Sequence, residues 1–152
     1  MQVDMVVKPV MFSEVDEFME NDDTYKLSHS DLVTMDTEFR CLDFGIILKE
    51  RANSKGMRCA VVGIHMEHPF YGDLMDGDHV WVAFETLDRG IVYYDPQVHN
   101  ERIDEPKIGS NLQLLMYEAA ERKDPTYDRY KDNGMDKSFI DAHIITNVMM
   151  IW

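Results

Sequence analysis

Hydrophobic and polar positions change period along the chain, and this predicts helices near the N-terminus followed by strands. Between residues 39 and 52, Leu42, Ile46 and Lys49 share one helical spacing, and Phe44, Ile47 and Leu48 share another. The apolar run at 57–66 predicts a strand that is buried on both faces. Strands are also predicted at 79–84 and 91–95. The fold class is therefore α+β: helices first, then a mainly antiparallel sheet, then a helix.

The ends of the helices are indicated by capping residues. Ser13, followed by first-turn acids, predicts the start of a first helix that ends near residues 21–23. Asp36 and Thr37 are suitable caps for the second helix, and Gly56 can adopt the left-handed conformation after its end. This places Cys41 in about the first turn of that helix. Ser110 is predicted to cap a third helix that continues through Ala120.

Turn residues predict how the strands connect. Residues 67–77 are predicted to form a loop, and residues 87–90 a hairpin turn. A simple hairpin centred on Asp88 and Arg89 sets His79 opposite Val98, so a contact with Asp95 needs a shifted turn, a bulge or strong twist. The apolar end of the chain, residues 148–152, is interpreted as the end of a buried strand or helix.

Composition favours one acidic domain over residues 1–152, without a nucleic-acid partner. The chain has 15 Lys+Arg against 29 Asp+Glu, for a net charge of −14, and such a field repels phosphate backbones and anionic membranes. The N-terminus lacks the features of a signal peptide, and no apolar run reaches the ~20 residues needed to span a bilayer. A cytoplasmic location is expected, and the two cysteines, Cys41 and Cys59, are too few for a disulfide scaffold.

The two cysteines differ in their predicted settings. A nucleophilic thiol needs a push toward thiolate, a nearby base, and a group that orients the base. Cys41 lies at a helix start, where unpaired N–H groups and the helix dipole favour a thiolate. Cys59 lies in mid-strand beside Ala60 and Val61, where a thiol acts as an inert small hydrophobe. Cys41 is therefore the candidate nucleophile.

Three motifs in the region 36–97 resemble the transglutaminase-like superfamily. The first is Cys41-Leu42-Asp43-Phe44-Gly45, leading through a helix and Gly56 into the strand that contains Cys59. The second is His79-Val80-Trp81-Val82, and the third is Ile91-Val92-Tyr93-Tyr94-Asp95-Pro96, a strand that ends in Asp-Pro. The spacing between His79 and Asp95 is similar to that of compact microbial members of the superfamily.

This resemblance implies a papain-like fold, with the helix that bears Cys41 packed on the antiparallel sheet that bears His79 and Asp95. It implies that Cys41 attacks an amide or acyl carbonyl, His79 protonates the leaving amine, and Asp95 orients the imidazole. The expected function is thioester-forming acyl transfer on a protein, peptide or small amide, with peptidase or amidase activity favoured over transamidation. No cofactor or metal is required.

Two other functions remain open. One hypothesis is a catalytically inactive binding or scaffolding domain that keeps this fold, and it is based on Arg40 before Cys41 and on the short chain. The other hypothesis is a metal-dependent module, because imidazole and carboxylate ligands gather within fifteen residues, although their spacing matches no compact metal motif. The candidate ligands are His65, His68, Asp73, Asp76, Asp78 and His79.

Overall fold

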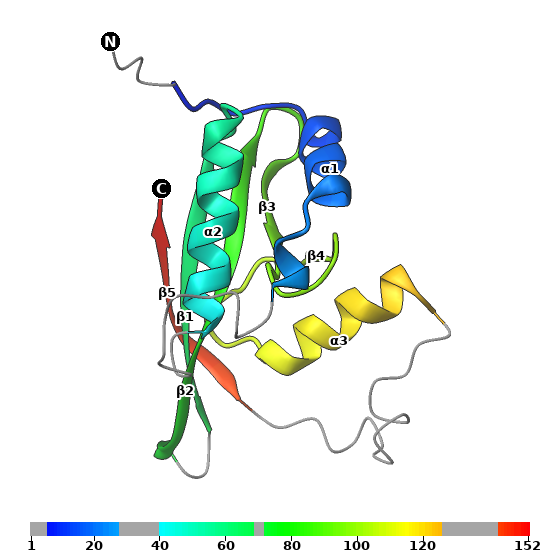
Figure 1. The fold of residues 1–152 in the computed structure, drawn as a ribbon. Helices are drawn as coiled ribbons and strands as arrows, with labels where there is room; N and C mark the ends of the chain where they lie inside the picture. The colour runs from blue at the N-terminus through cyan, green and yellow to red at the C-terminus, as the bar shows by residue number, and fades with distance from the viewer. Residues whose placement is uncertain (1–5, 28–39, 69–71, 126–142) are drawn as a thin grey trace.

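The computed structural model describes residues 6–27, 40–68, 72–125 and 143–152. The helices are α1 (Phe12–Asn21), a short 3-10 helix η1 (Thr24–Lys26), α2 (Arg40–Ser54) and α3 (Leu112–Lys123). The strands are β1 (Cys59–His68), β2 (Gly72–Thr86), β3 (Gly90–Tyr94), β4 (Arg102–Ile103) and β5 (Ile144–Ile151). They form one antiparallel sheet of five strands in the order β4-β3-β2-β1-β5 (Figure 1). The α+β prediction is confirmed.

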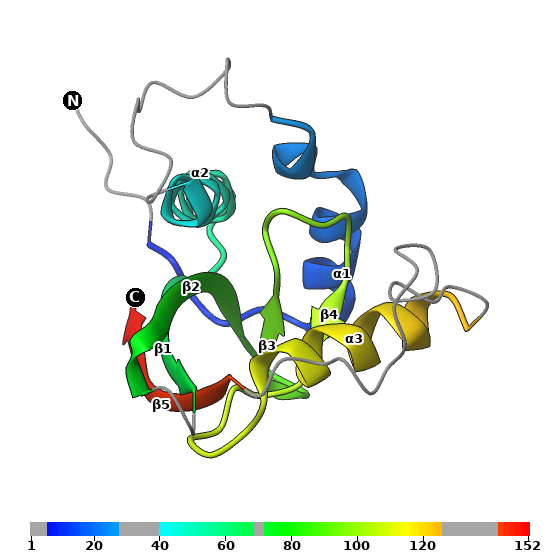
Figure 2. The same ribbon diagram turned by 90° about the horizontal axis from the view of Figure 1, so that it is seen from below.

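Helices cover both faces of the sheet, so the core has two halves. On one face, α1 and α2 bury a cluster of Val15, Phe18, Met19, Leu48 and Ala52 with Cys59, Val82, Phe84, Val92 and Tyr94. On the other face, α3 contributes Leu112 and Ala119 to a cluster with Ala60, Val62, Ile64, Trp81, Ala83, Tyr93, Ile103 and Ile145. Figure 2 shows the sheet between these two helical layers. Alternate residues of β1 and β2 therefore face different helices, which explains why the stretches 59–64 and 80–84 of these strands are continuously apolar.

The end of the chain corrects the predicted order of elements. The described chain does not close with a helix: β5 follows α3 and returns to pair with β1. Its burial is one-sided, because Val148 and Met150 pack against the α3-side cluster while Met149 and Ile151 are 58% and 55% exposed. Residues 148–152 therefore belong to the end of a strand, as one of the two interpretations has it, but none of them is fully buried. None of the helices in the described part of the chain is long and apolar enough to cross a membrane.

Two predicted helix caps are wrong by one or two residues. The helix α1 begins at Phe12, and its N-cap is Met11, whose N–H donates to the Glu14 carboxylate at 3.0 Å. The Phe12 N–H donates to Oδ1 of Asp88, which lies 76 residues away on the β2–β3 turn. At α3 the cap is Asn111, whose side chain accepts from the Leu114 N–H at 3.1 Å. Local hydroxyl patterns could not reveal an acceptor that comes from a distant turn.

The predicted loop at 67–77 is also wrong at both ends. The strand β1 continues to His68 and β2 already begins at Gly72, with an irregularity between Met66 and His68. Backbone pairing between the two long strands outweighs the low strand preference of the Gly and Asp residues there. Asp36 and Thr37, the predicted caps of α2, lie outside the described residues.

Candidate active site

Cys41 is the second residue of α2, as the sequence predicts, and its side chain is partly exposed. At the other end of the helix, Gly56 has the expected left-handed conformation with a φ of 80°. The helix lies against β1 and β2, and Gly45, one turn after Cys41, is in close contact with Val80. Because Gly45 has no side chain, α2 can lie close to β2 at Val80, next to His79.

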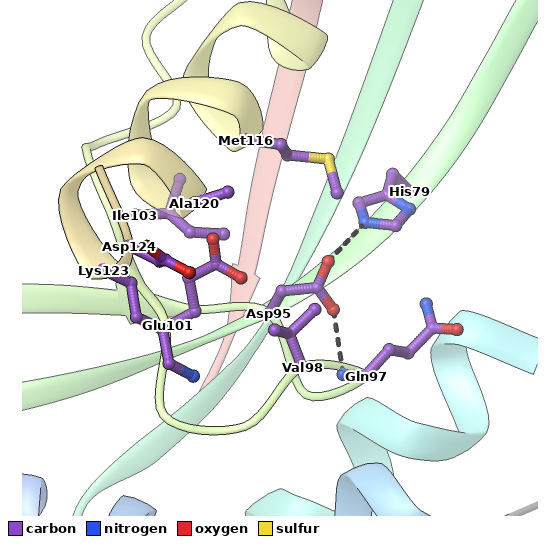
Figure 3. Close-up of a pocket in the computed structure, with 10 residues that line it drawn as sticks. All are labelled: His79, Asp95, Gln97, Val98, Glu101, Ile103, Met116, Ala120, Lys123 and Asp124. Atoms are coloured by element: carbon purple, nitrogen blue, oxygen red, sulfur yellow. Dashed lines mark hydrogen bonds and ion pairs between the residues drawn. The ribbon is translucent and has the colours of Figure 1, made fainter. Parts of the chain in front are cut away.

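His79, in the middle of β2, forms a pair with Asp95, which directly follows β3. The Nε2 of His79 lies 3.4 Å from Oδ2 of Asp95, and their side chains are 18% and 3% exposed (Figure 3). The other carboxylate oxygen of Asp95 accepts the Gln97 N–H at 2.9 Å. Both oxygens therefore have defined partners, and the carboxylate is fixed in orientation behind the imidazole ring.

The register of the hairpin explains how this pair forms. Thr86 pairs with Gly90 and Val82 with Tyr94, so the hairpin is centred on Asp88 and the predicted register is corrected by one residue. Continued along this register, position 95 comes opposite Trp81, two residues from His79 on the same face. Diagonal neighbours of this kind are close enough for polar side chains to meet. The shifted turn, one of the three predicted possibilities, thus brings Asp95 within reach of His79.

Cys41 completes the arrangement, because its thiol lies close enough to His79 to raise the pKa of the imidazole. Cys41 comes from the α2 layer, whereas His79 shares its face with Trp81, on the α3 side. They meet at the edge of β2, since β3 ends at Tyr94, opposite Val82, and no longer flanks β2 at His79. Because Nε2 faces Asp95, Nδ1 is the ring nitrogen left for the thiol. The structure therefore brings all three predicted residues together.

The surroundings of His79 favour its charged form. Burial by itself lowers the pKa of His79, but the hydrogen bond and charge interaction with Asp95, together with the interaction with Cys41, outweigh the effect of burial. Together they raise the pKa from 6.5 to about 9. Trp81 places its ring edge-to-face with the imidazole, with a centroid separation of 6.1 Å. At neutral pH the imidazole is thus a proton donor that is held between a thiol and a carboxylate.

Cys59 has a different environment, as predicted. It is 1% exposed on β1, and burial raises the pKa of its thiol far above the ordinary value. Its sulfur contacts the Ala60 carbonyl oxygen at 3.8 Å. A thiol in this position is kept protonated and out of reach of solutes, so it provides an internal reference for the reactivity of Cys41.

A cleft of about 580 Å³ opens beside the His79–Asp95 pair. The other lining residues come from the segment after β3, from β4 and from α3: Gln97, Val98, Glu101, Ile103, Met116, Ala120, Lys123 and Asp124 (Figure 3). Sequence reasoning missed all eight. Neither Gln97 nor Glu101 belongs to a motif, and α3 carries no feature that distinguishes its cleft-lining residues from ordinary core positions.

The candidate metal ligands whose side chains the structure describes do not converge on one point. Nδ1 of His65 lies 2.7 Å from the Asp78 carboxylate and Nε2 lies 3.7 Å from the Glu67 carboxylate. Both ring nitrogens of His65 therefore face a carboxylate. His68 packs its ring against His143, and His79 faces Asp95. Among the described residues, no three His, Cys, Asp or Glu side chains are grouped around a common metal position. The side chains of Asp73 and Asp76 lie outside the described residues.

Comparison of the chain with models of protein families, with curated proteins and with solved structures gave no match.

Proposed function

We propose that this protein is a cysteine-dependent acyl-transfer enzyme, with a transglutaminase-like arrangement of Cys41, His79 and Asp95 on a papain-like core. One observation carries the proposal: His79 is hydrogen-bonded to Asp95 and interacts with Cys41, although the three residues come from separate segments of the chain. A nucleophile, a base in contact with it, and a group that orients the base are the components that thiol catalysis needs.

In the first step of the proposed reaction, Cys41 reacts as a thiolate paired with the protonated His79 imidazole, and its sulfur forms a bond to the carbonyl carbon of an amide. The carbonyl oxygen becomes an oxyanion that accepts a hydrogen bond from the N–H of Cys41, because the first N–H groups of a helix lack partners within the helix. Protonated His79 then gives its proton to the amide nitrogen, the C–N bond breaks, and the amine leaves. The product that stays on the enzyme is a thioester.

In the second step, water attacks the thioester and His79 takes a proton from it. The C–S bond breaks, a carboxylic acid is released, and Cys41 is regenerated. The balance of the two steps is the hydrolysis of an amide to an acid and an amine. An amine in place of water gives transamidation, but the cleft is 580 Å³ in volume and open to water, so hydrolysis of a peptide or small amide is the favoured outcome.

Alkylation with iodoacetamide tests the proposed nucleophile. Mass spectrometry of the digested protein measures modification at both cysteines, and we expect Cys41 to react at least about 100-fold faster than Cys59. Replacing His79 with Gln should slow the reaction of Cys41 by about tenfold or more. Equal, slow modification of Cys41 and Cys59 in the folded protein contradicts the proposal. Hydrolysis of fluorogenic peptide amides, lost in Cys41→Ala, then measures turnover.

A second candidate function is a binding module without turnover. It is favoured by the cleft, which His79 and Asp95 line but Cys41 does not. In that case, Cys41→Ala should leave the affinity for a bound peptide unchanged, and no peptide amide should be hydrolysed by the wild-type protein. Substitutions of cleft residues such as Met116 should instead weaken binding.

A further inference from the structure

The strand β5 forms one edge of the sheet, and the two halves of this strand differ in what covers them (Figure 1). In the first half, the Ile145 N–H donates to the Ser110 carbonyl, and the Ile145 carbonyl accepts the Gly109 N–H, each at 2.8 Å. From Thr146 to Ile151, no backbone–backbone hydrogen bond joins the outer edge to another segment in the described part of the chain. The second half of β5 is therefore an open edge, where backbone donors and acceptors are available to another strand.

The composition of this open edge favours pairing with a further strand. The stretch from Ile144 to Ile151 contains no charged residue, proline or glycine, in a chain in which 29% of the residues are charged. After one irregularity near Thr146, residues 147–151 pair regularly with β1. Met149 and Ile151 lie on the α2 side of the strand and are 58% and 55% exposed. Proteins usually protect an edge strand with charges, proline or irregular backbone, and the stretch 147–151 has none of these.

The charges beside β5 change sign from one end of the strand to the other. Near its last residues, the Lys49 ammonium of α2 donates to the Ile151 carbonyl at 3.2 Å, and it makes no ion pair with any residue that the structure describes. Near its first residues, the carboxylates of Glu67 and Asp78 flank the His65 imidazole on the neighbouring strands. Because two carboxylates exceed one imidazolium, that end is negative even when the ring is protonated. An antiparallel copy of β5 would bring these opposite charges together.

We propose that the open edge of β5 pairs with the same edge of a second copy of this chain, antiparallel and centred on Met149. The two-fold axis is then perpendicular to the sheet, and α2 lies on the same side in both copies. Met149 lies opposite its own counterpart, and Ile151 lies opposite Asn147 of the other copy. The Lys49 end of each copy meets the Glu67 end of the other, which offsets the repulsion between two chains of net charge −14.

The opposite edge of the sheet explains why assembly stops at two copies. There, β4 has only two residues, Arg102 and Ile103. The Arg102 carbonyl already accepts a hydrogen bond from the Arg122 guanidinium at 3.2 Å. Among the described strands, β5 is therefore the long one with an open edge, and self-pairing uses it in both copies. The product is a closed dimer with one continuous sheet.

Analytical ultracentrifugation of the full chain tests the assembly. We expect a mass near that of two chains at about 100 μM protein, with dissociation on dilution. Met149→Lys places two like charges opposite each other and should weaken dimerisation by at least about tenfold. The matched control is Leu87→Lys, which adds the same charge at a 68% exposed apolar residue of the β2–β3 turn and should keep the dimer.

A disulfide tests the register, and this test does not depend on whether the Met149→Lys protein folds. Residues that face each other across an antiparallel pair have Cα atoms about 4.5–5.5 Å apart, within the range that a disulfide spans. In a Cys41→Ser background, Met149→Cys should form a disulfide-linked dimer with oxidised glutathione. Leu87→Cys in the same background should stay a single chain on a non-reducing gel. The remaining thiol, Cys59, is 1% exposed and does not compete.

Several outcomes overturn the proposed dimer. One is a wild-type protein that stays monomeric at about 100 μM, and another is a species larger than two copies, since self-pairing of β5 leaves no edge for growth. A folded Met149→Lys protein that dimerises as tightly as the wild type also overturns it, as does equal weakening by Leu87→Lys, because the effect is then one of net charge. Absence of the disulfide in Met149→Cys excludes the register centred on this residue and with it the proposed pairing.

Discussion

Gly45 of α2 lies so close to Val80 of β2 that a β-carbon added at Gly45 would stand 2.8 Å from Cγ1 of Val80. Glycine in the middle of a helix normally costs about 1 kcal/mol relative to alanine. Here it allows close contact between the helix that begins at Cys41 and the strand that contains His79. Val80 is branched at its β-carbon and buried, so it has few ways to move aside.

We predict that Gly45→Ala destabilises the protein, against the usual effect of alanine in a helix. The overpacking should outweigh the gain in helix propensity and lower the free energy of unfolding by about 1–2 kcal/mol. It should also slow iodoacetamide alkylation of Cys41, because α2 moves away from His79. The double variant Gly45→Ala/Val80→Ala provides the control, since it removes the clash and should restore the alkylation rate. An increase in stability of the single variant contradicts the close contact.

The charge of His79 predicts how stability depends on pH. The folded-state pKa of about 9 lies above the ordinary value of 6.5, so the folded protein binds the proton more tightly than the unfolded chain. Protonation of His79 therefore contributes about 3 kcal/mol to the free energy of unfolding. The contribution is fully present below pH 6.5 and is lost as the pH rises through 9. Urea unfolding should show this decline between pH 6.5 and 9. The fall in stability over this pH range should be smaller in the His79→Gln variant. An equally large fall in that variant contradicts the assignment to His79.

Asp95→Asn should separate the charge of this side chain from its position. Asparagine keeps an oxygen to accept the Gln97 N–H but removes the negative charge next to His79. The pKa of His79 should fall below its wild-type value of about 9, as NMR titration of the imidazole protons can measure. Hydrolysis should drop on the order of 10²–10⁴-fold if the proposed mechanism holds. A His79 pKa that stays at about 9 contradicts the pairing.

Asp88→Ala tests the long-range cap of α1. Loss of the Asp88 acceptor leaves the Phe12 N–H unsatisfied at the start of the helix, which should cost about 1 kcal/mol of stability in thermal or urea unfolding. The matched variant Asp88→Asn keeps the Oδ1 acceptor and should lose only about a few tenths of a kcal/mol of stability. The reactivity of Cys41 should be the same in both, because the β2–β3 turn lies outside the cleft lining.

Local patterns in the sequence were sufficient for the elements that carry the candidate site. The spacing of Leu42, Ile46 and Lys49 predicted α2 with Cys41 in its first turn, and Gly56 predicted its end. Apolar runs bounded by turn residues predicted β1 and the hairpin of β2 and β3. These features depend on interactions between residues a few positions apart, and the local sequence determines those interactions directly.

The tertiary structure alone decided which side chains meet. The diagonal contact between His79 and Asp95 depends on a pairing register that differs by one residue from the predicted one. The cap on Phe12 comes from Asp88, and the cleft beside His79 combines the segment after β3 with one side of α3. Each of these depends on a pairing between segments that are far apart in the chain. A one-residue shift in register reverses the face of every side chain on a strand, and no periodic pattern along a single segment determines its partner's register.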